Sequence, residues 1–170
     1  MLRRYRELVY ALVAIVAITA IYVLAYQQAG AFPAASGLVG HGIGVIGFIL
    51  MLMTETLYSI RKLLTDARWG NMASWLKFHM VTGLVGPYMV LLHTSMRFVG
   101  LAGVAMLLTG VVVVSGLVGR YIYTAIPRAS AAERGALATW YSVHVPLTWA
   151  LFVTATVHMA GAVYYATLQR

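Results

Sequence analysis

The chain has 170 residues, of which 62% are hydrophobic and 9% are charged, and its mean hydropathy is +0.85. Soluble domains contain about a quarter charged residues, and disordered chains combine low hydrophobicity with high charge, so both classes are excluded. The lack of cysteine excludes disulfides, thiolate metal sites, covalent haem attachment and cysteine nucleophiles. The formal net charge of +8 comes from scattered basic residues, which do not form a nucleic-acid-binding patch.

Four long segments carry no charged residue, and their lengths point to membrane-spanning helices. Asp, Glu, Lys and Arg are missing from residues 8–54, 78–96, 98–119 and 135–169. About 20 apolar residues cross a bilayer core as a helix, and a continuous rather than alternating apolar pattern excludes a barrel. Ser130 and Glu133 have the spacing of a capping box, which predicts a helix leading into the last span. We therefore predict an all-α membrane protein, one domain over residues 1–170, with spans at 7–27, 38–63, 74–98, 101–123 and 138–168.

The basic residues predict the orientation of these spans. In an alternating five-span arrangement, only Arg97 and Arg170 of the 12 basic residues fall on one side. Because positive charge is retained in the cytoplasm, the N-terminus is expected to be cytoplasmic and the C-terminus non-cytoplasmic, in a bacterial-type cytoplasmic membrane. The other side carries Arg3, Arg4, Arg6, Arg61, Lys62, Arg68, Lys77, Arg120, Arg128 and Arg134.

Four of the five histidines form two pairs with the same spacing. His79 and His93 are 14 residues apart on the third span, and His144 and His158 are 14 apart on the fifth. Fourteen residues return to within about 40° of the same helix face after a rise of about 21 Å. Since one span separates the third from the fifth, the two helices run parallel, and their histidines are expected at two matched depths.

Two imidazoles at one depth are what a six-coordinate haem needs. We predict a bundle of five helices around two b-type haems, with His79 and His144 as ligands toward the cytoplasm and His93 and His158 as ligands toward the other side. Because both axial positions are filled, this arrangement favours electron transfer over oxygen chemistry. Hydrogen-bonded interhelical histidines and a histidine proton relay are the alternatives.

Several neighbouring residues are candidates for haem contacts. Gly83 and Gly86 give room for a flat macrocycle, or alternatively for helix packing. Arg97, one turn beyond His93, is a candidate partner for a propionate of the outer haem, and Arg120 for the inner haem, together with Lys77 and Arg128. Alternatively, Arg97 is an interfacial arginine whose side chain reaches the lipid headgroups. For the candidates at the inner haem, the alternative is that their charges only set the membrane topology.

Two polar residues on the second span, His41 and Glu55, are candidates for a quinone or proton site. They are 14 residues apart, and His41 has no partner histidine at a matching position. Alternatively, His41 forms a hydrogen bond to a propionate or to the loop, or it ligates a further haem in a partner. Glu55, an acid within a span, could instead pair with Arg61 or Lys62 or bond locally to Thr54 or Thr56.

The paired histidines resemble those of di-haem membrane cytochromes b. The matching stretches are His-Met-Val-Thr-Gly-Leu-Val-Gly-Pro-Tyr-Met-Val-Leu-Leu-His at 79–93, His-Val-Pro at 144–146 and Val-His-Met-Ala at 157–160. Their place on the third and fifth spans is most similar to the ferric reductase-like transmembrane domain that ferric reductases and NADPH oxidases share. The resemblance covers spans two to five and implies where haem binds, but not the substrate. Complete members also carry a sixth span and a flavin- and nicotinamide-binding domain, neither of which this sequence contains.

We therefore expect the electron donor to be another polypeptide, a quinol or a soluble carrier. The expected role is the membrane subunit of a larger redox complex, exchanging electrons with quinone or with an attached redox subunit. A stand-alone membrane reductase of ferric iron or quinone is the nearest alternative. A haem-free proton or solute transporter and a haem-binding anchor without electron flow are alternatives of other classes.

Overall fold

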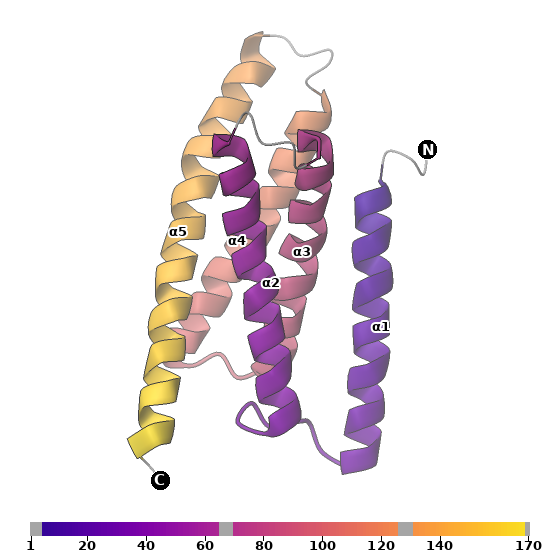
Figure 1. The fold of residues 1–170 in the computed structure, drawn as a ribbon, viewed down its shortest axis with the longest axis vertical. Helices are drawn as coiled ribbons and strands as arrows, with labels where there is room; N and C mark the ends of the chain where they lie inside the picture. The colour runs from indigo at the N-terminus through magenta and orange to yellow at the C-terminus, as the bar shows by residue number, and fades with distance from the viewer. Residues whose placement is uncertain (1–4, 65–69, 126–130, 169–170) are drawn as a thin grey trace. The chain divides into compact units, whose positions relative to one another are not determined.

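The computed structural model describes residues 5–64, 70–125 and 131–168, and these residues form helices joined by short connections, with no strand among them (Figure 1). Each helix is long and apolar enough to cross a bilayer, so the fold is compatible with a multi-pass membrane protein, as predicted. The five helices are α1 (Arg6–Ala29), α2 (Leu38–Leu63), α3 (Met72–His93), α4 (Gly100–Ala125) and α5 (Ala131–Leu168).

The helix ends follow local backbone preferences. Gly30 ends α1 in the left-handed region, at φ 67°, which glycine adopts without strain, and its N–H donates to the carbonyl of Tyr26 over 2.9 Å. Asn71 precedes α3, and its side-chain oxygen accepts the N–H of Ser74 over 2.8 Å.

Two helix ends differ from the predicted spans by more than two residues. α3 ends at His93 rather than residue 98, because Ser95 and Met96 have positive φ angles of 49° and 60° and cannot continue a helix. α5 begins at Ala131 rather than residue 138. Ser130, the first residue of the expected capping box, lies outside the described residues.

The helices group into two compact units, which are described separately: Met1–Met96 with α1 to α3, and Arg97–Arg170 with α4 and α5. In the first unit α3 packs against both α2 and α1. In the second unit α4 and α5 pack against each other as an antiparallel pair.

The contact between α2 and α3 has a regular seven-residue pattern. The buried residues of α2 alternate spacings of four and three, as in an antiparallel supercoiled pair, and are Gly40, Gly44, Gly47, Met51 and Thr54. We call this contact the α2–α3 seam, and α3 contributes His79, Thr82, Gly86, Met89 and His93 to it.

The middle of the α2–α3 seam is a contact between two backbones. A Cβ atom at Gly47 would lie 2.9 Å from the carbonyl oxygen of Gly86, and one at Gly86 would lie 2.9 Å from that of Gly47. Residues 42–47 have the pattern Gly-x-Gly-x-x-Gly, but they lie inside α2, so they do not form the strand-to-helix turn that binds dinucleotides.

The contact between α1 and α3 combines an apolar core with two hydroxyl groups. Ala11 of α1 packs with Val85 and Met89 of α3 in the buried cluster of this unit. The hydroxyl of Thr19 is hydrogen-bonded to that of Tyr88, and other apolar residues of α1 to α3 surround the cluster. α1 is thus fixed to the half of α3 that ends at His93.

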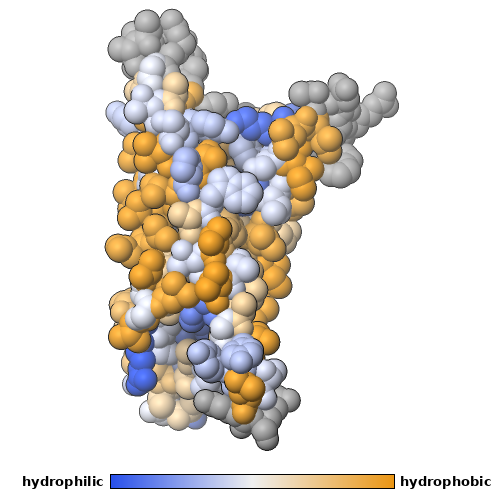
Figure 2. Space-filling view, turned by 90° about the vertical axis from the view of Figure 1, so that its left-hand side faces the viewer, coloured by the Kyte–Doolittle hydropathy of each residue, from blue (hydrophilic) through white to orange (hydrophobic). Residues whose placement is uncertain are grey.

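Much of the molecular surface is apolar. In the most hydrophobic stretch of each helix only 6% to 33% of the residues are buried, and hydrophobic side chains cover much of the face seen in Figure 2. A protein in water rarely exposes such continuous apolar surface, whereas lipid tails solvate it without penalty. The exposure therefore agrees with a membrane environment.

Candidate functional site

His79, near the beginning of α3, is held by α2. Its Nδ1 atom lies 3.0 Å from the carbonyl oxygen of Thr54, to which an Nδ1–H donates. The ring of Tyr58 packs on the imidazole with a centroid distance of 4.9 Å. The Thr54 hydroxyl also donates to the Thr82 hydroxyl oxygen over 2.6 Å, which ties the same two helices together beside the histidine.

His93, the last residue of α3, is held by α2 in the same way. Its Nδ1 atom lies 2.9 Å from the carbonyl oxygen of Gly40. A Cβ atom at Gly44 would lie 2.6 Å from Cγ of the His93 ring, so the imidazole occupies the space that this glycine leaves. The ring of His41 lies beside it, with a centroid distance of 6.5 Å.

The two contacts repeat with the same period on both helices. The ring-bearing residues of α3 are 14 apart, and so are Gly40 and Thr54, whose carbonyls accept the two Nδ1–H groups. Within the described residues neither Nε2 atom has a hydrogen-bond partner. Metal-ligating histidines usually donate their second ring N–H to a carbonyl, which fixes the ring and leaves the other nitrogen as the ligand. Both rings are therefore held by Nδ1, which leaves Nε2 as the nitrogen that can act as a ligand.

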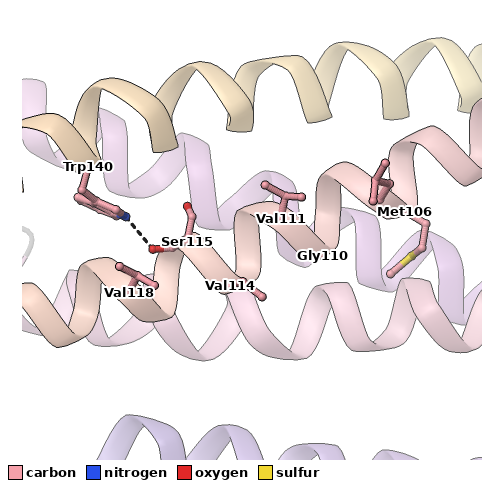
Figure 3. A pocket seen from close by; sticks show the side chains of 8 residues that line it. Met106, Gly110, Val111, Val114, Ser115, Val118 and Trp140 are labelled. Carbon is pink, nitrogen blue, oxygen red and sulfur yellow. Dashed lines mark hydrogen bonds between the residues drawn. The ribbon is translucent and has the colours of Figure 1, made fainter.

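In the second unit, His144 of α5 is held by two neighbours. Its Nδ1 atom is hydrogen-bonded to the hydroxyl of Ser115 on α4, and its ring is stacked on Trp140 at a centroid distance of 4.8 Å and an interplanar angle of 22°. The indole Nε1–H of Trp140 donates to the carbonyl of Ser115 over 2.6 Å (Figure 3). Trp140 lies where a Cβ atom at Gly119 would overlap its ring.

Ser115 and Trp140 lie at one end of an open apolar groove along α4 (Figure 3). The groove has a volume of about 600 Å³ and is lined mainly by valine, leucine and methionine side chains, with Gly110 leaving space in its middle. A flat apolar group could lie here without displacing a polar side chain.

His158 lies on the same continuous helix as His144, since α5 runs without interruption through Pro146. The ring is half-buried, and the described residues provide no hydrogen-bond partner for it. It is therefore the histidine of the four whose ring is not held within its own unit.

The other predicted site residues take different positions. Gly86 is buried in the α2–α3 seam, where it serves helix packing, and a Cβ atom at Gly83 would lie 3.4 Å from the Thr54 side chain. Arg97 is exposed in the connection after α3, so the helical turn expected to carry it beyond His93 does not form. Arg120 is half-buried on α4. Arg3, Arg4, Arg68, Arg128 and Arg170 lie outside the described residues.

His41 and Glu55 do not form one site. His41 is exposed in the first turn of α2 beside His93, whereas Glu55 lies 14 residues further along the same helix, a rise of about 21 Å. The Glu55 carboxylate accepts a hydrogen bond from the Ser59 hydroxyl over 3.3 Å.

The residues that hold the histidines were not among the predicted site residues. For Gly40 and Thr54 the signal was present in the sequence, because their 14-residue spacing matches that of the histidines. Ser115 and Trp140 carry no comparable pattern, because both contact the same histidine and no spacing is repeated.

Within either unit, no three His, Asp or Glu side chains of the described residues come together, as a compact metal cage would require. Comparison with known proteins gave no match to a family model, to a curated protein or to a solved structure.

Proposed function

We propose that this chain is a di-haem membrane cytochrome b that carries electrons across a bilayer. In this proposal, His79 and His144 ligate the inner haem, and His93 and His158 ligate the outer haem. One observation carries it: two α3 histidines 14 residues apart donate Nδ1–H to α2 carbonyls that are also 14 apart. Two haem ligands at two depths of one helix would each need such a carbonyl partner, and the regular α2–α3 seam supplies one to both.

The residues of the proposed sites would have separate roles. When bound, the haems would supply one-electron chemistry, and the Nε2 atoms of the four histidines would hold them. Gly40, Thr54 and Ser115 fix ring orientation, which keeps the ligands in place between oxidation states. Arg97 and Arg120 are candidate partners for propionates, and Gly83 for close approach of a macrocycle.

The partners belong to the same proposal. Electron transfer across a bilayer needs a donor and an acceptor, and in this proposal the chain is the membrane subunit of a larger redox complex that supplies them. Quinone or an attached redox subunit is the proposed partner class. His41 and Glu55 remain candidate quinone or proton contacts, but as two separate positions rather than one.

Haem content tests the proposal directly. The protein purified in detergent should give a b-type pyridine haemochrome with two haems per chain, and low-spin spectra before and after dithionite reduction. The expected stoichiometry follows from four histidines acting in two pairs. A protein purified from haem-replete cells without any b-type signal contradicts the proposal and favours the haem-free transporter.

The orientation of the chain in the membrane can be tested separately by cysteine labelling. Because the sequence contains no cysteine, a single introduced cysteine is the only thiol that can be labelled. Tyr5→Cys and Leu168→Cys are both exposed positions near the two ends. On spheroplasts, a membrane-impermeant maleimide should label Leu168→Cys and spare Tyr5→Cys, and permeabilised cells should label both. The reverse pattern contradicts the predicted topology, whereas labelling of both in sealed cells contradicts an odd number of spans.

A further inference from the structure

The end of α3 is separated from the rest of the helix by Pro87. Proline has no N–H, so position 87 cannot donate to the carbonyl of Gly83, and the backbone hydrogen bonding of the helix is interrupted there. Residues 88–93 follow, which make less than two helical turns and end at His93. We call them the terminal segment of α3. A segment this short is not stable by its own hydrogen bonds, so it depends on contacts with other helices.

The helix α1 contacts the terminal segment through two hydroxyl groups. The Thr19 hydroxyl donates to the Ile15 carbonyl over 2.7 Å and is also hydrogen-bonded to the hydroxyl of Tyr88, which is therefore the donor of that second bond. Further along α1, the Tyr22 hydroxyl donates to the Leu92 carbonyl over 3.4 Å. The two contacts join residues that are 69 and 70 positions apart, so α1 and α3 run parallel in a constant register here.

The contact of Tyr22 with Leu92 joins two buried groups. Tyr22 is 7% exposed and Leu92 is 8% exposed, and a buried polar group is costly unless it is hydrogen-bonded. The Leu92 carbonyl is one of the last four of α3, which have no partner within the helix. It accepts the N–H of Ser95 over 3.2 Å in addition to the Tyr22 hydroxyl. The hydroxyl thus completes the hydrogen bonding of the helix end, which a phenylalanine of nearly the same size would not do.

The terminal segment ends at a residue whose ring is held by a different helix. His93 follows Leu92 directly, and its Nδ1–H donates to the Gly40 carbonyl of α2 over 2.9 Å. α1 therefore fixes the backbone of the segment, while α2 binds the ring N–H. Because a hydrogen bond weakens steeply as its geometry departs from the optimum, releasing the backbone from α1 would weaken the contact of the ring with α2.

We propose that α1 positions the His93 ring through Thr19 and Tyr22, and that it tunes the haem which this histidine ligates. The inference rests on the proposed function and adds two positioning residues to it, on the helix that the resemblance to di-haem cytochromes does not cover. The hydrogen bond from Nδ1–H makes Nε2 a stronger donor, which favours ferric iron. Without the two α1 hydroxyls, the reduction potential of the His93 haem should therefore rise, while that of the His79 haem should not change.

The double variant Thr19→Val with Tyr22→Phe removes the two hydroxyls and nearly keeps the size of both side chains. Hydrogen–deuterium exchange of the whole protein in detergent should become about tenfold faster in the terminal segment and at Ser95, because two buried hydrogen bonds are lost. The matched control makes the same two substitutions at Thr56 and Tyr10, which are exposed and whose hydroxyls are hydrogen-bonded within their own helices. Thr56→Val with Tyr10→Phe should exchange like the unmodified protein.

Two single-histidine backgrounds separate the haems without depending on which histidines share an iron. His79→Ala should leave the His93 haem low-spin, and His93→Ala should leave the His79 haem low-spin. A reductive titration of the low-spin absorbance should give a higher potential for Thr19→Val with Tyr22→Phe in the first background and an unchanged potential in the second. If a background fails to fold, the same titration in the otherwise unmodified chain should show a rise in one of the two potentials.

Unchanged exchange in the terminal segment overturns the inference. Equal shifts of both potentials also overturn it, as does faster exchange without a shift at the His93 haem, because α1 would then contribute to stability alone. A protein purified without any b-type haem overturns the proposed function instead, and the exchange measurement then still decides whether the α1 hydroxyls hold the end of α3.

Discussion

In the proposed di-haem arrangement, replacing His79 and His144 together with alanine should leave one low-spin haem per chain, whereas replacing His79 and His158 together should leave none. This result is expected because the first change removes both ligands of a single iron, while the second removes one ligand from each of two. A haem with one remaining histidine becomes five-coordinate and loses its low-spin signal. Haem stoichiometry with electron paramagnetic resonance of the oxidised protein measures both quantities.

The double variants are informative because they report which two histidines share an iron, whereas single variants do not. Any single substitution lowers the low-spin content from two to one, whichever histidines are partners. If His79 were paired with His158 instead, the two double variants would exchange their results, and the histidine pairing predicted from the sequence would be wrong. His41→Ala is the matched control, because this histidine lies beside His93 but has no assigned iron, and it should retain two low-spin haems.

The helices could be predicted from the sequence because a bilayer imposes their length. α2 coincides with its predicted span, Leu38–Leu63, since Arg61 and Lys62 mark where the apolar segment ends. The end of α3 could not be predicted, because positive φ angles are uncommon for residues such as Ser95 and Met96 and no glycine or proline marks the position. Arg97 was misplaced on a helix for the same reason.

The candidate site was predictable only in part. The 14-residue spacing of the histidines is visible along one helix, since residues on a helix repeat with a known period. The partner of a ring on another helix depends on which faces pack together, and this is decided by the sum of many small contacts. The Ser115 hydroxyl could therefore be assigned to His144 only from the packed α4–α5 pair, whereas Trp140 precedes His144 by four residues on the same helix.

Gly47→Val should destabilise the first unit and disturb both proposed haem sites at once. The added Cβ would lie 2.9 Å from the Gly86 carbonyl oxygen and from Cβ of Met89, so α2 and α3 must move apart. Overpacking of this kind costs about 1–3 kcal/mol in the free energy of unfolding. Because Gly47 is at the middle of the α2–α3 seam, separation there also weakens the contacts of His79 with Thr54 and of His93 with Gly40.

Unfolding in detergent, followed by circular dichroism with haem content measured in parallel, checks this expectation. Gly42→Val is the matched control, because it makes the same substitution on the same helix at a position where a Cβ meets nothing within 4 Å. Both variants place the same valine in the same helix and share its effect on helix stability. The difference between their free energies of unfolding therefore measures the effect at the α2–α3 seam. If both variants lose equal stability, the backbone contact between Gly47 and Gly86 does not hold α2 on α3. If Gly47→Val loses stability while both low-spin signals remain unchanged, the α2 carbonyls are not what orients the two rings.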